Sequence, residues 1–398
     1  MILTFGTIHE GTRYRAKDRE KALIFQEICA NPEATRKEMA QKYGFRPTSV
    51  SRAVQEMLDD GLIAEGSSRE PGKPGRPEFF LKPNYNLLTA VSMYIEGREL
   101  KGALINPGEE IIAADSVYIP KDADNIKFKG LMLNLIDKLS SSTPGGSTLI
   151  GTALSLVGTV NPVNKLWISS ARFSAIKNLD FNKLETEKNI RITIRRSLDT
   201  ELEYQLIKNN ELTKKNVLLF HWGFGIGAAY AYRGKILGSA IGRFGEIGHT
   251  HVGSVKNKKC LCGAYGCLET EAAIWALVPL LKPDYPEADE DERKFSRFLR
   301  RPGIAELDII NNALSFTSIG LINLYKIFYP DIIMFIGPFT ENESVFSKLI
   351  ARFKAELPDY AREAVDYRVI MEGFRGAVTG NVYNLFRNKL RILLTAGY

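Results

Sequence analysis

The chain has 398 residues, 44% of them hydrophobic, which is enough for more than one buried core. No apolar run approaches the ~20 residues of a membrane-spanning helix, and the N-terminus lacks the pattern of a secretory signal. Four cysteines, three of them clustered, do not make a disulfide framework, so we expect a cytoplasmic protein. The net charge of +7 permits a nucleic-acid partner without requiring one.

The N-terminal region predicts three short helices. The first covers residues 17–30, which place their apolar side chains on one face. The second opens at a capping box formed by Thr35 and Glu38 and ends at Gly44. The third covers residues 47–60 and opens with a proline, which is favoured at a first helical position. Two short helices joined by a glycine-containing turn indicate a helix-turn-helix.

The third predicted helix has one apolar and one polar face. Val50, Val54 and Met57 follow helical spacing and should point inward. The outward residues suit base edges and phosphates, and we predict that they contact DNA: Thr48, Ser49, Ser51, Arg52 and Gln55. An ordinary three-helix bundle with a solvated face is the alternative.

Residues 62–82 predict a wing and linker. Two strands, over 62–65 and 78–81, enclose a tip that carries Lys73 and Arg76, which we also predict to contact DNA. Arg76 lies between a glycine and a proline, and such an arm can enter a narrow A·T-rich minor groove. The alternative is an exposed linker with incidental charges.

From about residue 87, β-type apolar runs alternate with helical stretches, which favours an α/β architecture with sheets covered by helices. We therefore expect a winged helix-turn-helix DNA-binding domain over residues 1–82, followed by a separate α/β domain over 87–398.

Residues 245–269 hold three of the four cysteines. Three thiolates and one imidazole match the preference of zinc for four tetrahedral ligands, and a fully ligated ion has a structural rather than a catalytic role. His249 and His251 are both candidates for the imidazole. Reduced cysteines without a metal are the alternative. The remaining cysteine, Cys29, lies on the apolar side of the first predicted helix, and we expect it to be a core residue.

This segment also carries the most specific family resemblance. It reads Gly-Glu-Ile-Gly-His over 245–249 and, ten residues later, Cys-x-Cys-Gly-x-x-Gly-Cys-x-Glu over 260–269. Weaker matches are the glycines of GFGIG at 223–227, ALSLVGTVNP at 153–162 and PDIIMFIG at 330–337. On these motifs the chain resembles, over nearly its whole length, the ROK family of repressors, open reading frames and sugar kinases.

The resemblance implies two actin-like (ribonuclease H-like) lobes around a cleft, with one structural Zn²⁺ per chain. It makes His249 the fourth zinc ligand, beside Cys260, Cys262 and Cys267. It also implies that four side chains bind a sugar: Asp199, Glu246, His249 and Glu269.

The two glutamates lie just outside the ligand set, so a closed zinc loop would hold both carboxylates ready to accept hydrogen bonds from sugar hydroxyls. Asp199 matches the base that activates the sugar hydroxyl in the kinases. In this chain Leu198 replaces the asparagine that precedes this base, so we expect Asp199 to be a vestigial base. The alternative for Asp199 is a helix N-cap.

Three differences from the ROK kinases predict that the chain does not bind ATP and is not an enzyme. Phosphoryl transfer needs loops whose N–H groups cradle phosphates. A lone Gly97 stands where the kinases carry Asp-x-Gly-Gly-Thr, Phe224 replaces a threonine, and Pro338 replaces a glycine and removes an N–H donor.

The sequence thus predicts a transcriptional regulator, a repressor, whose kinase-like domain senses a sugar or sugar derivative. We expect a homodimer on a two-fold symmetric operator, with lobe closure passed to the DNA-binding domain through a linker at 71–77. The alternatives are an active ROK sugar kinase with a DNA-binding head, and a zinc-stabilised regulator without a sugar ligand.

Overall fold

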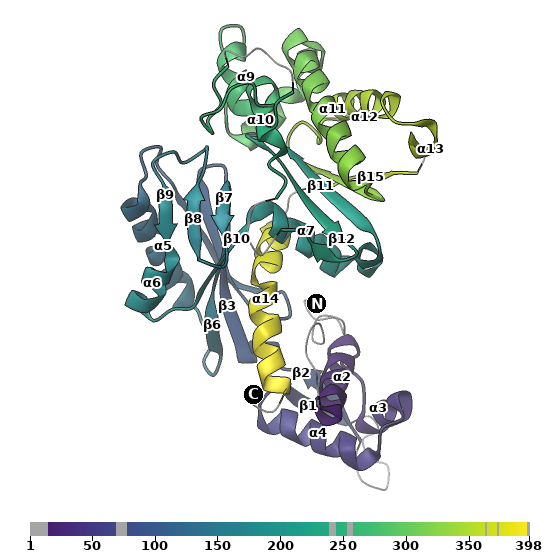
Figure 1. Cartoon of the computed structure of the whole chain (residues 1–398). Helices are drawn as coiled ribbons and strands as arrows, with labels where there is room; N and C mark the ends of the chain where they lie inside the picture. Colours follow the sequence, from purple (N-terminus) through teal and green to yellow (C-terminus); the bar gives the residue numbers. More distant parts are fainter. Residues whose placement is uncertain are drawn as a thin grey trace.

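The structure is a computed structural model that describes residues 15–68, 78–238, 244–252, 258–362, 364–371 and 374–395. It begins with three helices and an antiparallel strand pair, drawn in purple in Figure 1 and called the head below. The elements of the head are α2 (Ala16–Ala30), α3 (Arg36–Tyr43), α4 (Pro47–Asp59), β1 (Ile63–Ser68) and β2 (Phe79–Pro83).

Local chemistry sets the ends of the head's helices as the sequence predicts. Thr35 Oγ1 accepts the N–H of Glu38 at 3.3 Å, and the Glu38 carboxylate accepts the N–H of Thr35 at 3.1 Å, which completes the capping box. Gly44 ends α3 with φ +66°, a left-handed conformation that suits glycine. Pro47 is the first residue of α4. The three predicted helices are confirmed.

The two strands predicted on either side of the wing tip are also confirmed, because Glu65 pairs with Leu81 and Ile63 with Pro83. Lys73 and Arg76 lie outside the described residues. Since residues 69–77 join β1 to β2, the segment 71–77 connects two strands of the head. The expected linker at 71–77 is therefore wrong: the head joins the next domain through residues 84–87.

The first lobe is built on a five-stranded sheet with the order β10-β6-β3-β4-β5, in which β10, β6 and β3 are parallel. The central strand β3 is largely buried, and six of its nine residues are apolar, with Thr89 and Ser92 buried among them. The elements of this lobe are η1 (Tyr85–Leu87), β3 (Leu88–Glu96), β4 (Glu99–Ile105), β5 (Ile111–Tyr118), α5 (Asn125–Ser140), β6 (Thr148–Leu156), β7 (Thr159–Asn161), β8 (Leu166–Ser169), β9 (Lys177–Asp180), α6 (Phe181–Lys188) and β10 (Ile192–Arg196).

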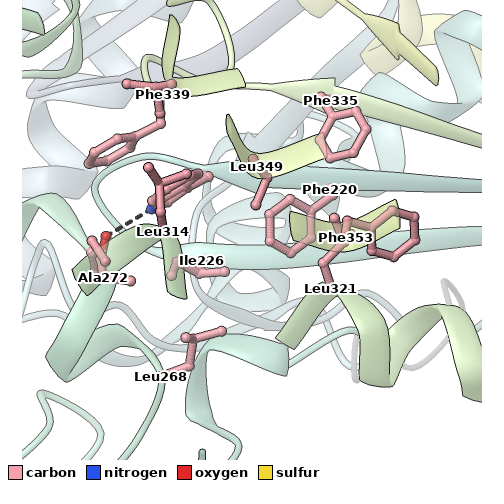
Figure 2. Packing of buried hydrophobic residues seen from close by; sticks show 14 of the residues in the cluster. Phe220, Ile226, Leu268, Ala272, Leu314, Leu321, Phe335, Phe339, Leu349 and Phe353 are labelled. Carbon is pink, nitrogen blue, oxygen red and sulfur yellow. Dashed lines mark hydrogen bonds between the residues drawn. The ribbon is translucent and has the colours of Figure 1, made fainter. Parts of the chain in front are cut away.

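The second lobe has its own five-stranded sheet, with the order β13-β12-β11-β14-β15. Figure 2 shows its core, where Phe220, Phe335 and Phe353 pack with Leu314 and Leu321. Its elements are η2 (Asn210–Lys214), β11 (Asn216–Trp222), β12 (Ile226–Tyr232), β13 (Lys235–Ile236), η3 (Ile247–His249), α8 (Glu269–Ala272), α9 (Ile274–Leu281), α10 (Glu292–Leu299), η4 (Ile304–Glu306), α11 (Asp308–Phe328), β14 (Ile332–Ile336), α12 (Glu343–Ala355), α13 (Asp359–Arg362) and β15 (Asp366–Val369).

Two further helices tie these parts together. Helix α7 (Ser197–Lys208) follows β10 and contacts both β10 and β12, one strand from each lobe. Helix α14 (Phe374–Leu394) follows the second lobe but returns to pack against β3, β6 and α7, and it contacts α2 of the head (Figure 1). Among the described residues no helix is long and apolar enough to cross a membrane.

Candidate functional site

A cavity of about 640 Å³ lies between the two lobes, within the size range of small-molecule sites. The first lobe contributes Ser155 and Arg172 to its walls, and the second contributes His221 and the β11–β12 turn. The first turns of α7 form another wall through Ser197, Leu198, Thr200 and Glu201. The cavity is therefore the candidate site for a small ligand.

The structure brings the four predicted metal ligands together beside this cavity. One ligand atom from each of His249, Cys260, Cys262 and Cys267 lies within 4.8 Å of the others, so the cluster could hold a metal ion. Cys260 Sγ lies 3.6 Å from His249 Nδ1, and Cys262 Sγ lies 3.8 Å from Cys267 Sγ. His251 stands outside the cluster, with its ring against Gly266.

Three of the four predicted sugar-binding residues line the cavity: Glu246, His249 and Glu269. His249 directs Nδ1 to the cysteines, while its Nε2 lies 3.8 Å from Glu246 Oε2. Glu269 is buried and held in place, because Ile226 N–H donates to its Oε1 at 2.8 Å and Trp275 Nε1–H donates to its Oε2 at 3.1 Å. The metal cluster and the cavity thus share one wall.

Asp199, the fourth predicted sugar-binding residue, is instead buried away from the cavity, with 2% of its surface exposed. Its Oδ1 accepts hydrogen bonds from Arg196 Nε at 3.2 Å and Nη2 at 2.7 Å. Arg196 also donates to the carbonyls of Ala228, at 2.9 Å, and Phe244. Asp199 is not the N-cap of α7 either, since Arg196 holds that position. Asp199 therefore neutralises a buried guanidinium that joins the two lobes.

Sequence reasoning missed a charged cluster at the rim of the cavity. Glu292 Oε1 accepts the N–H of Phe224 at 2.6 Å and lies 3.3 Å from His221 Nε2. Arg172 Nη2 lies 3.4 Å from Glu292 Oε2, and the guanidinium stacks 4.2 Å from the centre of the Phe224 ring. Arg172 Nη1 also donates to the carbonyl of Gly97 at 3.0 Å. Burial alone would raise the pKa of Glu292, but the charge of Arg172 and the bonds from His221 and Phe224 hold that pKa well below its usual range.

A second ion pair crosses the rim between α10 and β3. Arg293 donates from Nε and Nη2 to the two oxygens of Glu96, at 2.8 and 2.6 Å. Lys101 Nζ lies 2.6 Å from the same carboxylate. The partners in these two clusters are up to about two hundred positions apart in the sequence, and neither cluster follows a motif or a periodicity that could have indicated it.

The wall formed by α7 carries another carboxyl group that sequence reasoning missed. Glu201 lines the cavity and accepts a hydrogen bond from Gln205 Nε2 at 2.8 Å. Burial raises the pKa of Glu201. Ser197 and Glu201 both line the cavity, and they are four residues apart on one face of α7. This helical spacing is the sequence signal that places Glu201 on the same face as Ser197.

The predicted DNA-contacting residues lie on one face of α4. Val50, Val54 and Met57 are buried in the head. Ser49 is half-buried. The other four predicted residues of this helix are exposed on the face opposite the buried one: Thr48, Ser51, Arg52 and Gln55. The side chain of Arg52 is 71% exposed and donates to Glu56 at 3.2 Å. The polar face is thus available to a partner.

Two twisted sheets around a shared cavity, with a possible metal site on one wall, define an actin-like α/β protein. The ROK family model matches residues 92–386, and the chain belongs to the ROK family. The predicted resemblance is confirmed.

Relatives and solved structures agree with this assignment. The chain is 23% identical to the xylose repressor of Bacillus spizizenii, over 80% of this chain and 82% of that protein. It is 20% identical to the dual regulator NagC of Escherichia coli, over 90% of this chain and 92% of that protein. A crystal structure of a ROK family transcriptional regulator, described as a homologue of the E. coli MLC protein, is similar with a TM-score of 0.72 and 18% identity over 95% of this chain and 97% of its own.

A ROK family glucokinase from Streptomyces griseus, crystallised with glucose and AMPPNP, is similar with a TM-score of 0.59 and 17% identity. That match covers 74% of this chain and 97% of the glucokinase. At such identities these structures support the fold alone.

We expect Asp199→Ala to destabilise the protein by about 3–5 kcal/mol, because the substitution leaves the Arg196 charge buried without its carboxylate. Urea unfolding of the full chain measures this loss. Asp122→Ala serves as the control, because that acid is exposed and its ion pair with Lys127 lies at the surface. If Asp199→Ala unfolded like the wild type but no longer bound a sugar, the ligand role predicted from the sequence would stand.

Glu292→Gln should lower stability at neutral pH and flatten its dependence on acid. A carboxyl group whose pKa is depressed by folding stabilises the native state above its unfolded pKa of about 4.3, and the contribution is lost as pH falls toward the folded value. Unfolding measured between pH 3 and 7 should therefore show a shallower acid loss in Glu292→Gln than in the wild type. Glu187→Gln, on the exposed face of α6, should keep the wild-type slope.

Proposed function

We propose that the protein is a DNA-binding transcriptional regulator, a repressor, whose two-lobed domain senses a sugar or sugar derivative. The main support is that a cavity bordered by carboxylates and a head with an exposed polar helix occur in one chain. Relatives that cover most of the chain are named xylose repressor and N-acetylglucosamine repressor. Neither feature alone would favour regulation over catalysis.

The proposed DNA reader is a winged helix-turn-helix over residues 1–82. Helix α4 would enter the major groove, with Thr48, Ser49, Ser51, Arg52 and Gln55 toward the bases and phosphates. The strand pair β1–β2 would act as the wing, with Lys73 and Arg76 at its tip and Arg76 in the minor groove. One head covers little duplex, so we also propose a homodimer on a two-fold symmetric operator.

The proposed sugar contacts are Glu246, His249 and Glu269. Carboxylate oxygens accept strong hydrogen bonds from hydroxyl groups, and the two bonds that already hold Glu269 fix its orientation before a ligand arrives. Asp199 is left out of this set because its carboxylate is bonded to Arg196.

The proposed metal is a single structural zinc ion, bound by His249, Cys260, Cys262 and Cys267. Tetrahedral bonds of about 2.3 Å to sulfur and about 2.05 Å to nitrogen require S···S edges of about 3.8 Å and N···S edges of about 3.6 Å. Two of the six separations, Cys262 Sγ to Cys267 Sγ at 3.8 Å and Cys260 Sγ to His249 Nδ1 at 3.6 Å, match these edges, and all four ligand atoms lie within 4.8 Å of one another. When bound, the ion would cross-link the loop that carries Glu246 to the start of α8, which carries Glu269.

We further propose that the protein is not a sugar kinase. The N–H of Phe224, in the glycine-rich turn, already donates to Glu292. A carboxylate therefore occupies the donor that a phosphate would need and repels a second negative charge. Arg172 binds the Gly97 carbonyl at the other predicted phosphate loop, and Pro338 offers no N–H. These contacts weigh against the kinase alternative.

Binding of the full chain to a duplex selected from a randomised library tests the DNA-reading part. Arg52→Ala should weaken binding by about 1–3 kcal/mol if Arg52 reads a base, or reduce the salt dependence by about one unit if it contacts a phosphate. Fluorescence anisotropy at several salt concentrations separates the two cases. Lys138→Ala on α5 is the control, because it removes the same charge at a distance from α4.

The sugar-sensing part is tested by thermal shift with D-xylose, D-glucose and N-acetylglucosamine. One of them should raise the melting temperature by binding the native state, and Glu269→Gln should reduce that shift. The same sugar should change DNA affinity by the factor by which DNA changes sugar affinity. Measurable ATP-dependent phosphorylation of the sugar would instead favour the kinase.

Metal analysis of the purified chain should give close to one zinc per molecule. Cys262→Ser should lose the zinc and part of the folded state, since structural zinc binding contributes directly to folding. Cys29→Ala provides the control, because Cys29 lies in the head and should leave the zinc content unchanged. A metal-free wild type with the same melting temperature would overturn the zinc assignment.

A further inference from the structure

Helix α14 runs from the cavity to the head. Ala377, near its beginning, lines the cavity. Phe386, Leu390 and Leu394, near its end, belong to one buried hydrophobic cluster with residues of α2 such as Ile24. Figure 1 shows the helix, in yellow, with its C-terminal end beside the head. A single helix is thus in contact with both the cavity and the head.

At the cavity end, α14 crosses α7 at very close range. A Cβ atom at Gly380 would lie 2.5 Å from the carbonyl oxygen of Thr200 and 3.0 Å from Tyr204 Cβ. A Cβ atom at Gly376 would lie 3.0 Å from the Tyr204 ring. A side chain at position 380 would therefore clash with the backbone of α7, and one at position 376 would press on the Tyr204 ring. Because packed interiors are dense, α7 cannot shift at this crossing without displacing α14.

Polar bonds hold α14 to the first-lobe sheet next to this crossing. Asn381 Nδ2 donates to the carbonyls of Met93 on β3, at 2.8 Å, and Ala153 on β6, at 2.7 Å. Ser92 Oγ–H donates to the carbonyl of Val378 at 2.8 Å. All of these groups are buried. They provide a fixed point near residues 378–381. A push from the Tyr204 ring on Gly376, which lies before that point in the helix, would tilt the remaining length of α14 about it.

The wall that would receive a ligand belongs to α7. Leu198, Thr200 and Glu201 line the cavity, and the carbonyl of Thr200 is the atom against which Gly380 packs. Thr200 Oγ1 also lies 3.0 Å from Ser155 Oγ, another cavity-lining group. A ligand that contacts this wall would therefore act within one residue of the α14 crossing.

We propose that α14 is the lever that couples occupancy of the cavity to the head, a role that rests on the proposed function. Displacement of α7 by a ligand tilts α14 about its bonds to β3 and β6, and the buried end of the helix moves α2 and so α4. This route takes the place of the linker expected at residues 71–77, which lies within the head.

The first test needs no ligand. Hydrogen exchange is followed in the wild type, in Gly380→Ala and in Gly130→Ala, where the glycine of α5 has open space around it. Gly380→Ala should speed amide exchange several-fold in α7, in the second half of α14 and in α2, whereas Gly130→Ala should leave α2 unchanged. Faster exchange in α7 with α2 at the wild-type rate would overturn the lever.

The second test measures coupling with whichever of D-xylose, D-glucose or N-acetylglucosamine raises the melting temperature of the wild type. Leu394 is buried at the end of α14, whereas Ile392, two residues earlier, is half-exposed. Leu394→Ala should keep the wild-type sugar affinity but bring the factor by which the sugar changes DNA affinity close to one, from the 5- to 150-fold that is usual for coupled sites. Ile392→Ala should keep the full factor.

The two tests fail in different ways. If no sugar binds the wild type, the proposed function fails, while the exchange experiment still decides whether α14 links α7 to the head. If a sugar binds and changes DNA affinity equally in the wild type and in Leu394→Ala, the sensing function stands and the lever is wrong. Should Gly380→Ala fail to fold, as judged by circular dichroism, the Leu394→Ala comparison decides.

Discussion

The buried guanidinium of Arg196 is the constraint on which the arrangement of the two lobes depends. Arg196 is the last residue of β10 in the first lobe. Its guanidinium donates to Asp199 on α7 and to the carbonyl of Ala228 on β12. It also donates to the carbonyl of Phe244, just before the loop that carries Glu246. A buried charge is costly unless it is paired and fully hydrogen-bonded. The lobes are therefore held together where Arg196 lines the cavity, a place called the floor below, and the Asp199 carboxylate balances the charge of that guanidinium.

The ion pairs at the opposite rim differ in kind. Arg293 is 58% exposed and Glu96 21% exposed, so their pair is worth little in water despite its good geometry. Arg172 is more enclosed, but its partner Glu292 remains partly exposed. A strong buried contact at the floor and weaker ones at the rim make the floor the natural hinge. The same rim contacts occupy the N–H of Phe224 and the carbonyl of Gly97, so they join the two glycine-containing turns of the two lobes.

The sequence predicted best what depends on neighbouring residues. The capping box at Thr35, the proline that opens α4 and the close spacing of the zinc-loop cysteines all act within a few positions, and each appears in the structure as expected. The rim clusters were not predictable, because the contacts that join Gly97, Arg172 and Glu292 depend on how two distant loops meet the start of α10. The burial of Asp199 was not predictable for a related reason: family position indicated its residue type but not its contacts with Arg196.

The energies involved are compatible with regulation by a small ligand. Opening the rim breaks the pair between Arg293 and Glu96, whose exposed guanidinium limits it to about 0–1 kcal/mol. It also breaks the more enclosed contacts of Arg172 with Glu292 and with the Phe224 ring. A ligand can shift such an equilibrium only by its differential affinity for the two states, and coupling free energies of about 1–3 kcal/mol are usual. The free energy needed to open the rim is thus comparable to that of a few hydrogen bonds to a ligand, whereas the free energy needed to break the Arg196 contacts at the floor is larger. Because α14 crosses α7 directly beside that fixed floor, even a small movement of the cavity wall reaches the head through packed atoms rather than through a flexible connection.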